Sequence, residues 1–185
     1  MSSLIYTTSK SKADLSGIIE LQKTNLAANL TREEISCQGF VTVVHSFPVL
    51  KKMNDIEQHI ICKDKEKVIA YLLAMTAKSK NDIPVLLPMF ETFDKIVYKG
   101  KPVSSYNYMV VGQVCVDKNY RGQGILDKCY DMYKSSFKDR YDFAITEIAG
   151  SNLRSINAHK RIGFSEVKKY TISGFGEWSI VIFAW

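Results

Sequence analysis

The N-terminal part of the chain alternates between short apolar runs and segments with helical spacing. Residues 4–7 predict a first strand, and apolar residues recur at roughly helical spacing over residues 14–30, which predicts a helix. The sequence TREE at residues 31–34 has the capping-box pattern of a threonine followed three residues later by a glutamate. A second, short helix is therefore expected there. A serine and a proline mark the start of a third helix over residues 46–54.

The central part of the chain predicts a hairpin followed by a less regular region. Two apolar runs, residues 59–62 and 68–77, flank the charged segment KDKEK, which is typical of a β-hairpin with an exposed turn. Residues 78–108 contain three prolines and many aromatic side chains. Because proline interrupts regular structure, only a short helix over residues 89–98 is expected in this region.

The C-terminal part of the chain predicts alternating strands and helices. The expected strands are residues 110–116, 143–148, 164–173 and 178–185, and the expected helices are residues 125–137 and 153–161. This order predicts an α/β (α+β) fold, with helices inserted into a mostly antiparallel sheet. The chain shows no internal repeat and no flexible linker, so residues 1–185 are expected to form a single domain.

Composition and charge exclude several classes of partner. The net charge is +6, but the lysines are scattered and form no dense basic run, so nucleic acid is not expected. No apolar run is long enough to span a bilayer, and residues 1–9 do not resemble a signal peptide, so no membrane is expected either. The four cysteines form no C-x-x-C pair, which predicts no metal site and fits the reducing cytoplasm.

One glycine-rich turn carries the first chemical signal. Residues 114–134 read VCVDKNYRGQGILDKCYDMYK, a strand that runs through a polar turn directly into a helix. A helix start has amide groups without intrahelical partners and the positive end of the helix dipole, and together these bind phosphate. Gly122 and Gly124 allow close approach of an anion, and Arg121 adds a charged fork of donors.

Two better-known phosphate motifs do not fit this turn. The chain has no G-x-x-x-x-G-K-[ST] string, and Asp127 stands where a dinucleotide-binding turn would have its third glycine. The remaining R-G-x-G pattern is compatible with a phosphate site. The alternative is a tight turn that only joins the strand to the helix.

The next segment makes the functional interpretation of this turn more specific. ITEIAGSNLRSINAHKRIGF, residues 145–164, has an asparagine, a small residue three positions later, an aromatic seven positions later and then Gly-Phe. With the R-G-Q-G turn before it, this segment resembles the signature of the GNAT (GCN5-related N-acetyltransferase) family. The resemblance covers roughly residues 109 to 165. It implies a mixed sheet flanked by helices, with a splayed fourth and fifth strand.

The resemblance also implies a cosubstrate, acetyl-CoA, bound without a metal. Its pantetheine arm would lie along the fourth strand, its pyrophosphate would lie on the turn, and an asparagine side chain would bond the arm. The cofactor-binding residues implied in this way are Val114, Cys115, Val116, Arg121, Gly122, Gln123, Gly124, Ile125, Leu126 and Asn152.

Two residues are candidates for the acid and base chemistry of acetyl transfer. Glu147 resembles the general base of the ribosomal-protein alanine acetyltransferases of the family, although it could instead face solvent or pair with a lysine. Gln113 with a water is the next candidate for the base. His159 stands where most relatives carry the tyrosine that protonates the departing thiolate. It could instead pack against the cofactor or cap a helix.

The acceptor is expected to be a primary amine of a small molecule or a peptide. Residues 38–49 and 81–108 are expected to form the acceptor side, and Tyr106 and Tyr108 are weaker candidates to line it. Two alternatives to an N-acetyltransferase stay open. One is a non-catalytic acyl-CoA-binding or sensor module, and the other is a regulatory or structural protein that uses the sheet for dimer contacts; a homodimer is possible in any case.

Overall fold

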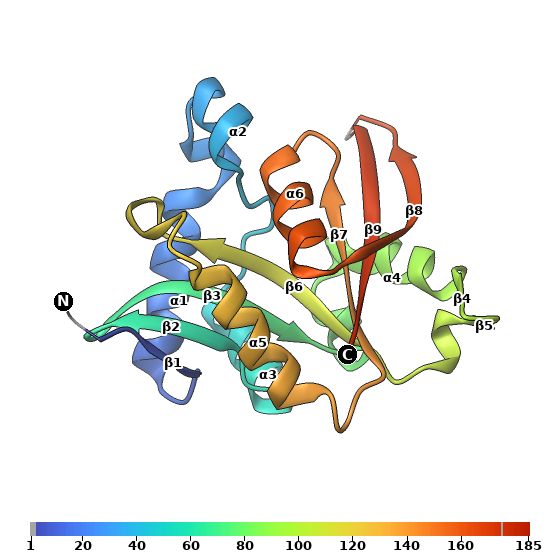
Figure 1. Ribbon diagram of the computed structural model, residues 1–185, viewed down its shortest axis with the longest axis horizontal. Coiled ribbons are helices and arrows are strands. Elements are labelled where there is room, and N and C mark those ends of the chain that lie inside the picture. The colour runs from blue at the N-terminus through green and yellow to red at the C-terminus, as the bar shows by residue number, and fades with distance from the viewer. Residues whose placement is uncertain (1–2, 175) are drawn as a thin grey trace.

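Seven strands form one sheet in the computed structural model, which describes residues 3–174 and 176–185 apart from the side chains of residues 36 and 37 (Figure 1). In spatial order they are β1 (Ile5–Thr8), β2 (Ile60–Asp64), β3 (Lys67–Met75), β6 (Met109–Val116), β7 (Phe143–Ala149), β9 (Gly176–Ala184) and β8 (Ser165–Ile172). Neighbouring strands are antiparallel except for β6 and β7, which are parallel. Separately, β4 (Val97–Tyr98) pairs with β5 (Lys101–Pro102). The predicted mostly antiparallel sheet is confirmed.

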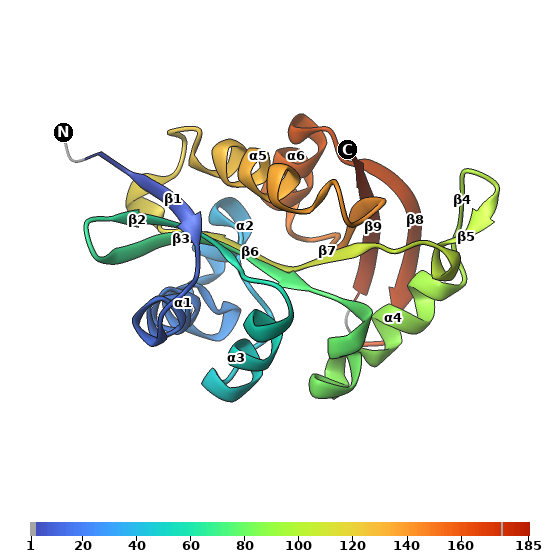
Figure 2. The same cartoon turned by 90° about the horizontal axis from the view of Figure 1, so that it is seen from below.

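Helices cover both faces of this sheet. They are α1 (Lys12–Asn25), α2 (Arg32–Gln38), α3 (Phe47–Ile56), α4 (Leu87–Asp94), α5 (Ile125–Phe137) and α6 (Leu153–Ile162). Figure 2 shows α1, α3 and α4 on one side of the sheet and α5 and α6 on the other. Each side has its own apolar core, as expected for a sheet whose strands bury both faces. No helix within the described residues is long and apolar enough to cross a membrane.

The predicted helix over residues 14–30 is wrong at its C-terminal end. Helix α1 stops at Asn25, and residues 27–29 form a separate 3₁₀ turn. The backbone there bonds a distant segment instead, because Val41 donates to the carbonyl of Asn25 at 3.0 Å and Ala27 donates to the carbonyl of Val41 at 3.1 Å. The predicted capping box is confirmed, with Glu34 and Thr31 bonding reciprocally at 3.0 and 3.1 Å.

Strands β6 and β7 separate soon after they meet. They pair at only two positions, Met109 with Ala144 and Val110 with Ile145, although both strands continue well beyond them. Beyond these pairs, β6 stays bonded to β3 alone. The implied splay between these two strands is therefore present.

A β-bulge lies where the two strands part. Leu72 pairs with Val114 and Ala74 pairs with Val111, so Gly112 and Gln113 of β6 together face one residue of β3. Such a bulge adds a residue on one side of a ladder and bends the strand that carries it. The bulge thus turns β6 away from β7 and opens the sheet between them (Figure 1).

The bulge also delivers a polar side chain into the core between β6 and α1. The amide oxygen of Gln113 accepts from the hydroxyl of Tyr71 at 2.6 Å and from Gln22 at 2.9 Å, and its amide nitrogen donates to the carbonyl of Val43 at 2.9 Å. Gln22 in turn accepts from the backbone amide of His45 at 2.8 Å. This buried network fixes the 40–45 segment against β6.

We expect Gln113→Leu to destabilise the fold substantially. It removes the bonds that Gln113 makes with the hydroxyl of Tyr71 and the carbonyl of Val43, and each buried group left unsatisfied costs about 1–3 kcal/mol. The amide of Gln22 loses one of its two bonds and keeps the one to His45. Because the surrounding groups can partly rearrange, the free energy of unfolding should fall by about 2–4 kcal/mol, measured by urea denaturation.

The matched control is Gln123→Leu. Gln123 is exposed and its side chain donates to the carbonyl of Asn119, so its replacement should change the free energy of unfolding by less than about 0.5 kcal/mol. Equal stability of the two variants would show that the Gln113 network does not hold the segment.

Candidate functional site

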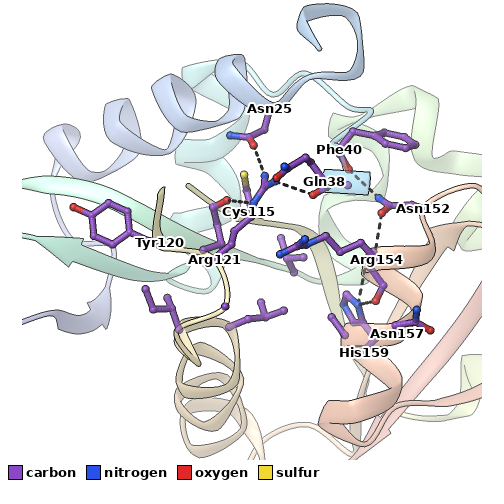
Figure 3. A pocket seen from close by; sticks show the side chains of 18 of the residues that line it. Asn25, Gln38, Phe40, Cys115, Tyr120, Arg121, Asn152, Arg154, Asn157 and His159 are labelled. Carbon is purple, nitrogen blue, oxygen red and sulfur yellow. Dashed lines mark hydrogen bonds between the residues drawn. The ribbon is translucent and has the colours of Figure 1, made fainter. Parts of the chain in front are cut away.

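A cavity of about 550 Å³ opens where β6 has left β7 (Figure 3). Its walls are the C-terminal end of β6, the turn that leads into α5, the first turns of α6, and residues 38–41. Segments that are far apart in sequence therefore enclose one space.

The glycine turn forms one wall of this cavity. Gly122 and Gly124 have φ angles of 78° and 73°, a region that side-chain-bearing residues rarely adopt. Gly124 is the N-cap of α5 and provides no side chain to the first-turn amides. A Cβ added at either glycine would meet nothing within 4 Å, so open space lies beside these amides. This is the geometry of an anion site at a helix start.

The predicted residues of the turn divide into two groups. Ile125 and Leu126, at the start of α5, line the cavity together with the two glycines. Gln123 does not line it, because its side chain is exposed and donates to the carbonyl of Asn119 at 3.2 Å. The cavity wall is therefore made mainly by the backbone of the turn.

The guanidinium of Arg121 donates its hydrogen bonds to other parts of the protein. It donates to the carbonyl of Val116 at 2.9 Å, to the side chain of Asn25 at 2.7 Å, and to both the carbonyl and the side-chain oxygen of Gln38, at 2.8 and 2.9 Å. It thereby ties the glycine turn to the ends of α1 and α2. Its charge still contributes to the potential of the cavity, which it lines.

The end of β6 forms the floor of the cavity. Val114, Cys115 and Val116 line it, and past Val110 the edge of β6 that faces β7 has no ladder partner. Backbone groups on such an edge can bond an extended ligand. Burial raises the pKa of the Cys115 thiol to about 12, so this thiol stays protonated and does not act as a nucleophile at neutral pH.

Asn152 joins α6 to the opposite wall. Its side-chain oxygen accepts from the amide of Ser155 at 3.2 Å and caps α6, while its side-chain nitrogen donates to the carbonyl of Phe40 at 3.1 Å. Gly39 packs against this side chain, since an added Cβ there would lie 3.0 Å from the Asn152 oxygen. Asn152 lines the cavity as predicted from the sequence, and its bond to the pantetheine stays a prediction.

His159 is buried and neutral. Its Nδ1 lies 2.8 Å from the carbonyl of Ser155, which can only accept, so Nδ1 carries the proton and Nε2 accepts from the hydroxyl of Tyr130 at 2.7 Å. Burial lowers the pKa of His159 to about 4. Both ring nitrogens are thus engaged inside the protein, and the ring holds no titratable proton near neutral pH.

A smaller cavity of about 90 Å³ adjoins the first, between β6 and β7. The residues that line both are Phe40, Val41, Val114, Asn152, Ser155 and His159. Glu147 of β7 lines the smaller cavity and accepts a hydrogen bond from the hydroxyl of Tyr170 on β8. Burial raises the pKa of the Glu147 carboxyl, and the bond from Tyr170 opposes that rise.

Of three further side chains named from the sequence, Gln113 lines the smaller cavity and the two tyrosines line neither. Both ends of the Gln113 amide are used in the core, so the structure offers no support for its orienting a water. Tyr108 is buried and stacks on Phe143 with ring centroids 6.1 Å apart, and Tyr106 donates to the carbonyl of Tyr98 at 2.9 Å. Neither tyrosine lines the two cavities.

The structure adds three residues that the sequence did not indicate, Arg154, Trp178 and Tyr170, and it places Phe40, which belongs to the expected acceptor segment 38–49, at both cavities. Phe40 and Arg154 line the larger cavity, Phe40 and Trp178 line the smaller one, and Tyr170 bonds Glu147. No local motif surrounds any of them, and each is brought in by a contact between segments distant in sequence. No three metal-ligating side chains gather anywhere in the described part of the chain.

Comparison with known proteins agrees with this geometry. Residues 29–164 match the family model described as the acetyltransferase (GNAT) family. No match to a curated protein was found by sequence. Among solved structures, a chain of the NatC complex bound to Gag peptide and CoA superposes with a TM-score of 0.66 at 14% identity, with 99% of each chain covered.

Two further solved structures share the fold. The ribosomal-protein-S18-alanine N-acetyltransferase from Escherichia coli has a TM-score of 0.63 at 13% identity, covering 98% of this chain and 94% of its own. NAA60 from Arabidopsis thaliana in complex with acetyl-CoA has a TM-score of 0.60 at 13% identity, covering 99% of this chain and 100% of its own. Since the family model matches residues 29–164, which is well over half of the sequence, the chain belongs to the acetyltransferase (GNAT) family.

Proposed function

We propose that this protein transfers an acetyl group from acetyl-CoA to a primary amine of a small molecule or a peptide. The observation that carries the proposal is that the two cavities share a wall. The glycine turn lines the larger one and Glu147 lines the smaller one, and six residues line both. A cosubstrate bound at the turn would therefore present its reactive end to a carboxylate.

The cavity suits the parts of acetyl-CoA in order. The amides of the turn from Arg121 to Leu126 would hold the pyrophosphate, and the unpaired edge of β6 at Val114 and Val116 would hold the pantetheine arm. Asn152 would bond the same arm from α6. The thioester would then lie in the gap between β6 and β7, where an amide of β6 can polarise its carbonyl.

Glu147 is the group that we propose as the general base. An alkyl ammonium has a pKa of about 10.4, so the acceptor arrives protonated and must lose a proton before its nitrogen can attack the thioester carbon. The attack forms the new C–N bond, and collapse of the tetrahedral intermediate breaks the C–S bond. A carboxylate with a raised pKa in a partly enclosed cavity is suited to accept that proton near neutrality.

For His159 we propose a positioning role in place of the predicted acid. A neutral ring with Nδ1 bonded to a carbonyl and Nε2 bonded to Tyr130 has no proton to give at neutral pH. Its place on the wall shared by the two cavities supports a role in shaping the channel. A thiol has an ordinary pKa of about 8.5, so its thiolate can depart without a strong acid.

The acceptor class rests on the chemistry of the smaller cavity and on relatives. A carboxylate faces a small space bounded by Phe40 and Trp178, which suits an amine carried on an extended chain. The solved structures of similar fold include a complex with Gag peptide, a ribosomal-protein alanine acetyltransferase and a spermidine N-acetyltransferase. Both peptide and small-molecule amines are therefore consistent with this fold.

We also infer that residues 1–185 form one acetyltransferase domain that works in a reducing compartment such as the cytoplasm. One sheet joins Ile5 to Ala184, which supports a single domain. Cys62, Cys115 and Cys129 are free and buried, which suits a reducing environment. Formation of a homodimer stays a prediction.

Gly124→Glu should abolish acetyl-CoA binding while the protein stays folded. The new side chain would place a negative charge in the open space beside the amides of the turn. Gly100→Glu is the matched control, because Gly100 has a φ of 80° and also has nothing within 4 Å of an added Cβ, but lies outside the cavity. Calorimetric titration with acetyl-CoA should show binding by the control alone. Binding of normal affinity by Gly124→Glu would remove the pyrophosphate from the turn.

Glu147→Gln should slow turnover by about 10²–10⁴-fold, the usual contribution of general-base catalysis, with little change in acetyl-CoA affinity. The wild-type rate should rise with pH through the ionisation of Glu147, above the usual carboxyl range because burial raises its pKa, and the variant should lack that limb. Glu166→Gln, an exposed carboxyl on β8, is the control and should keep the wild-type profile. A wild-type rate in Glu147→Gln across this pH range would place the base elsewhere.

His159→Phe should reduce turnover by less than about tenfold, because general-acid catalysis, worth about 10²–10⁴-fold, is not lost. The wild-type profile should show no limb from this histidine between about pH 5 and 8, since its pKa of about 4 leaves it neutral throughout. Tyr130→Phe, which removes only the bond to Nε2, should behave similarly. A hundredfold loss in His159→Phe at unchanged acetyl-CoA affinity would restore the acid role.

A further inference from the structure

Tyr170 reaches Glu147 across an intervening strand. Strand β9 lies between β7, which carries Glu147, and β8, which carries Tyr170 (Figure 1). Glu147 pairs with Ile180 of β9, and Tyr170 pairs with Trp178, two residues away on the same strand. Paired residues, and residues two apart on a strand, point to the same face of a sheet. Both side chains therefore lie on one face, and the phenol spans the width of β9 to donate its hydroxyl proton to the carboxylate.

Apolar packing holds the ring of Tyr170 in place. The residue is half-buried and packs against the apolar core on the side of the sheet that α1, α3 and α4 cover (Figure 2). A tyrosine side chain has only two torsions, so a packed ring also gives its hydroxyl group a fixed position. The carboxylate of Glu147 lies at the end of a longer, more flexible chain. The rigid partner of this pair therefore sets the place of the flexible one.

The carboxylate of Glu147 depends on Tyr170 for its polar contact within the protein. In the part of the chain that the structure describes, Glu147 forms no ion pair, and Tyr170 is the one side chain that bonds it. An ionised carboxylate in a partly enclosed cavity needs donors that replace the water it has lost, and a bond to a charged acceptor is among the stronger hydrogen bonds. The phenol bonds Oε2, which leaves Oε1 for a proton from a substrate.

We propose that Tyr170 is a positioning residue for the general base, whose hydroxyl holds Oε2 of Glu147 so that Oε1 is presented to the ammonium group of the acceptor. This inference rests on the proposed function, since it takes Glu147 to be the base. In the proton-transfer step the N–H bond of the ammonium breaks and an O–H bond forms at Oε1, while the bond from Tyr170 to Oε2 is kept. Tyr170 itself keeps its proton, because burial and the bond to Glu147 raise its pKa far above neutrality.

The bond also makes the working pH range of the base depend on Tyr170. Burial raises the pKa of the Glu147 carboxyl, and donation from Tyr170 lowers it by favouring the ionised form. Only the ionised carboxylate accepts a proton, so activity is lost as the pH falls through this pKa. Removal of the phenol hydroxyl should raise the pKa and move that limb of the pH profile upward.

The neighbouring titratable groups leave this effect to Tyr170. Among the described residues that line the smaller cavity, His159 is the other titratable one, and it is neutral above about pH 4. The linings from β6, β9 and residues 40–43 include no titratable side chain within the same described set. On β8, Lys168 pairs with the residue of β9 that also pairs with Glu147, so it shares their face of the sheet, but it forms no ion pair with Glu147.

The first test measures the titration of Glu147 directly, without reference to activity. Protein labelled with ¹³C at the glutamate carboxyl carbons is titrated by NMR, and the Glu147 signal is identified by its absence from Glu147→Gln. Tyr170→Phe, which removes one oxygen and keeps the ring, should move the titration of this signal to higher pH. Tyr141→Phe is the matched control, because Tyr141 also donates to a carboxylate, that of Glu57 at 2.8 Å, but lines neither cavity. An unmoved Glu147 titration in Tyr170→Phe would overturn the inference.

The second test measures thiol release from acetyl-CoA against pH, with a panel of peptide and small-molecule primary amines. Below the midpoint of the wild-type limb, Tyr170→Phe should be slower by at least about tenfold, as for loss of a hydrogen bond to a charged group, and the deficit should shrink as the pH rises. Tyr141→Phe should match wild type, and Tyr170→Phe should add nothing to Glu147→Gln. A deficit that is equal at every pH, or one that persists in the Glu147→Gln background, would reduce Tyr170 to packing and overturn the inference. Absence of amine-dependent thiol release by the wild type would instead overturn the proposed function, whatever the NMR titration shows.

Discussion

The parting of β6 from β7 is the constraint on which the site depends. Two strands that kept their ladder would leave no space between them, because paired strands lie about 4.8 Å apart. That pairing ends at Val110, and the bulge at Gly112 and Gln113 begins two residues later. It leaves backbone groups of β6 without partners inside the sheet, where unpaired groups are costly unless a ligand or water satisfies them. The gap and the unpaired edge therefore arise from one irregularity.

The segment that covers this gap, residues 39–46, forms no helix or strand. Side chains from three separate elements hold it through its carbonyl groups: Arg121 bonds Gln38, Asn152 bonds Phe40, and Gln113 bonds Val43. A loop whose backbone is satisfied by distant side chains keeps one conformation only while all of them are in place. The larger and the smaller cavity are thus joined through a single covering segment.

Charge in the site comes more from backbone geometry than from composition. The scattered lysines that give the chain its net charge of +6 do not form the cavity, whereas the starts of α5 and α6 both line it. One start is capped by a glycine and leaves its amides open, and the other is capped by Asn152. The first-turn amides of α5 thus have no side-chain cap, whereas α6 is capped by a side chain. Burial acts in opposite ways on the two titratable groups, since it raises the pKa of Glu147 and lowers that of His159.

The sequence by itself determined the strand-turn-helix unit around Gly122 and Gly124, the capping box, most helices and strands, and the family. Each of these follows from local spacing, which local backbone sterics and capping enforce. Only the tertiary structure decided where α1 ends, what Arg121 bonds, and that His159 is neutral. Those outcomes depend on contacts between segments distant along the chain, such as the pairing of Val41 with the end of α1 and the approach of Tyr130 to α6. Periodicity and motifs carry no information about such contacts, because burial and hydrogen-bond partners exist only after the segments have packed.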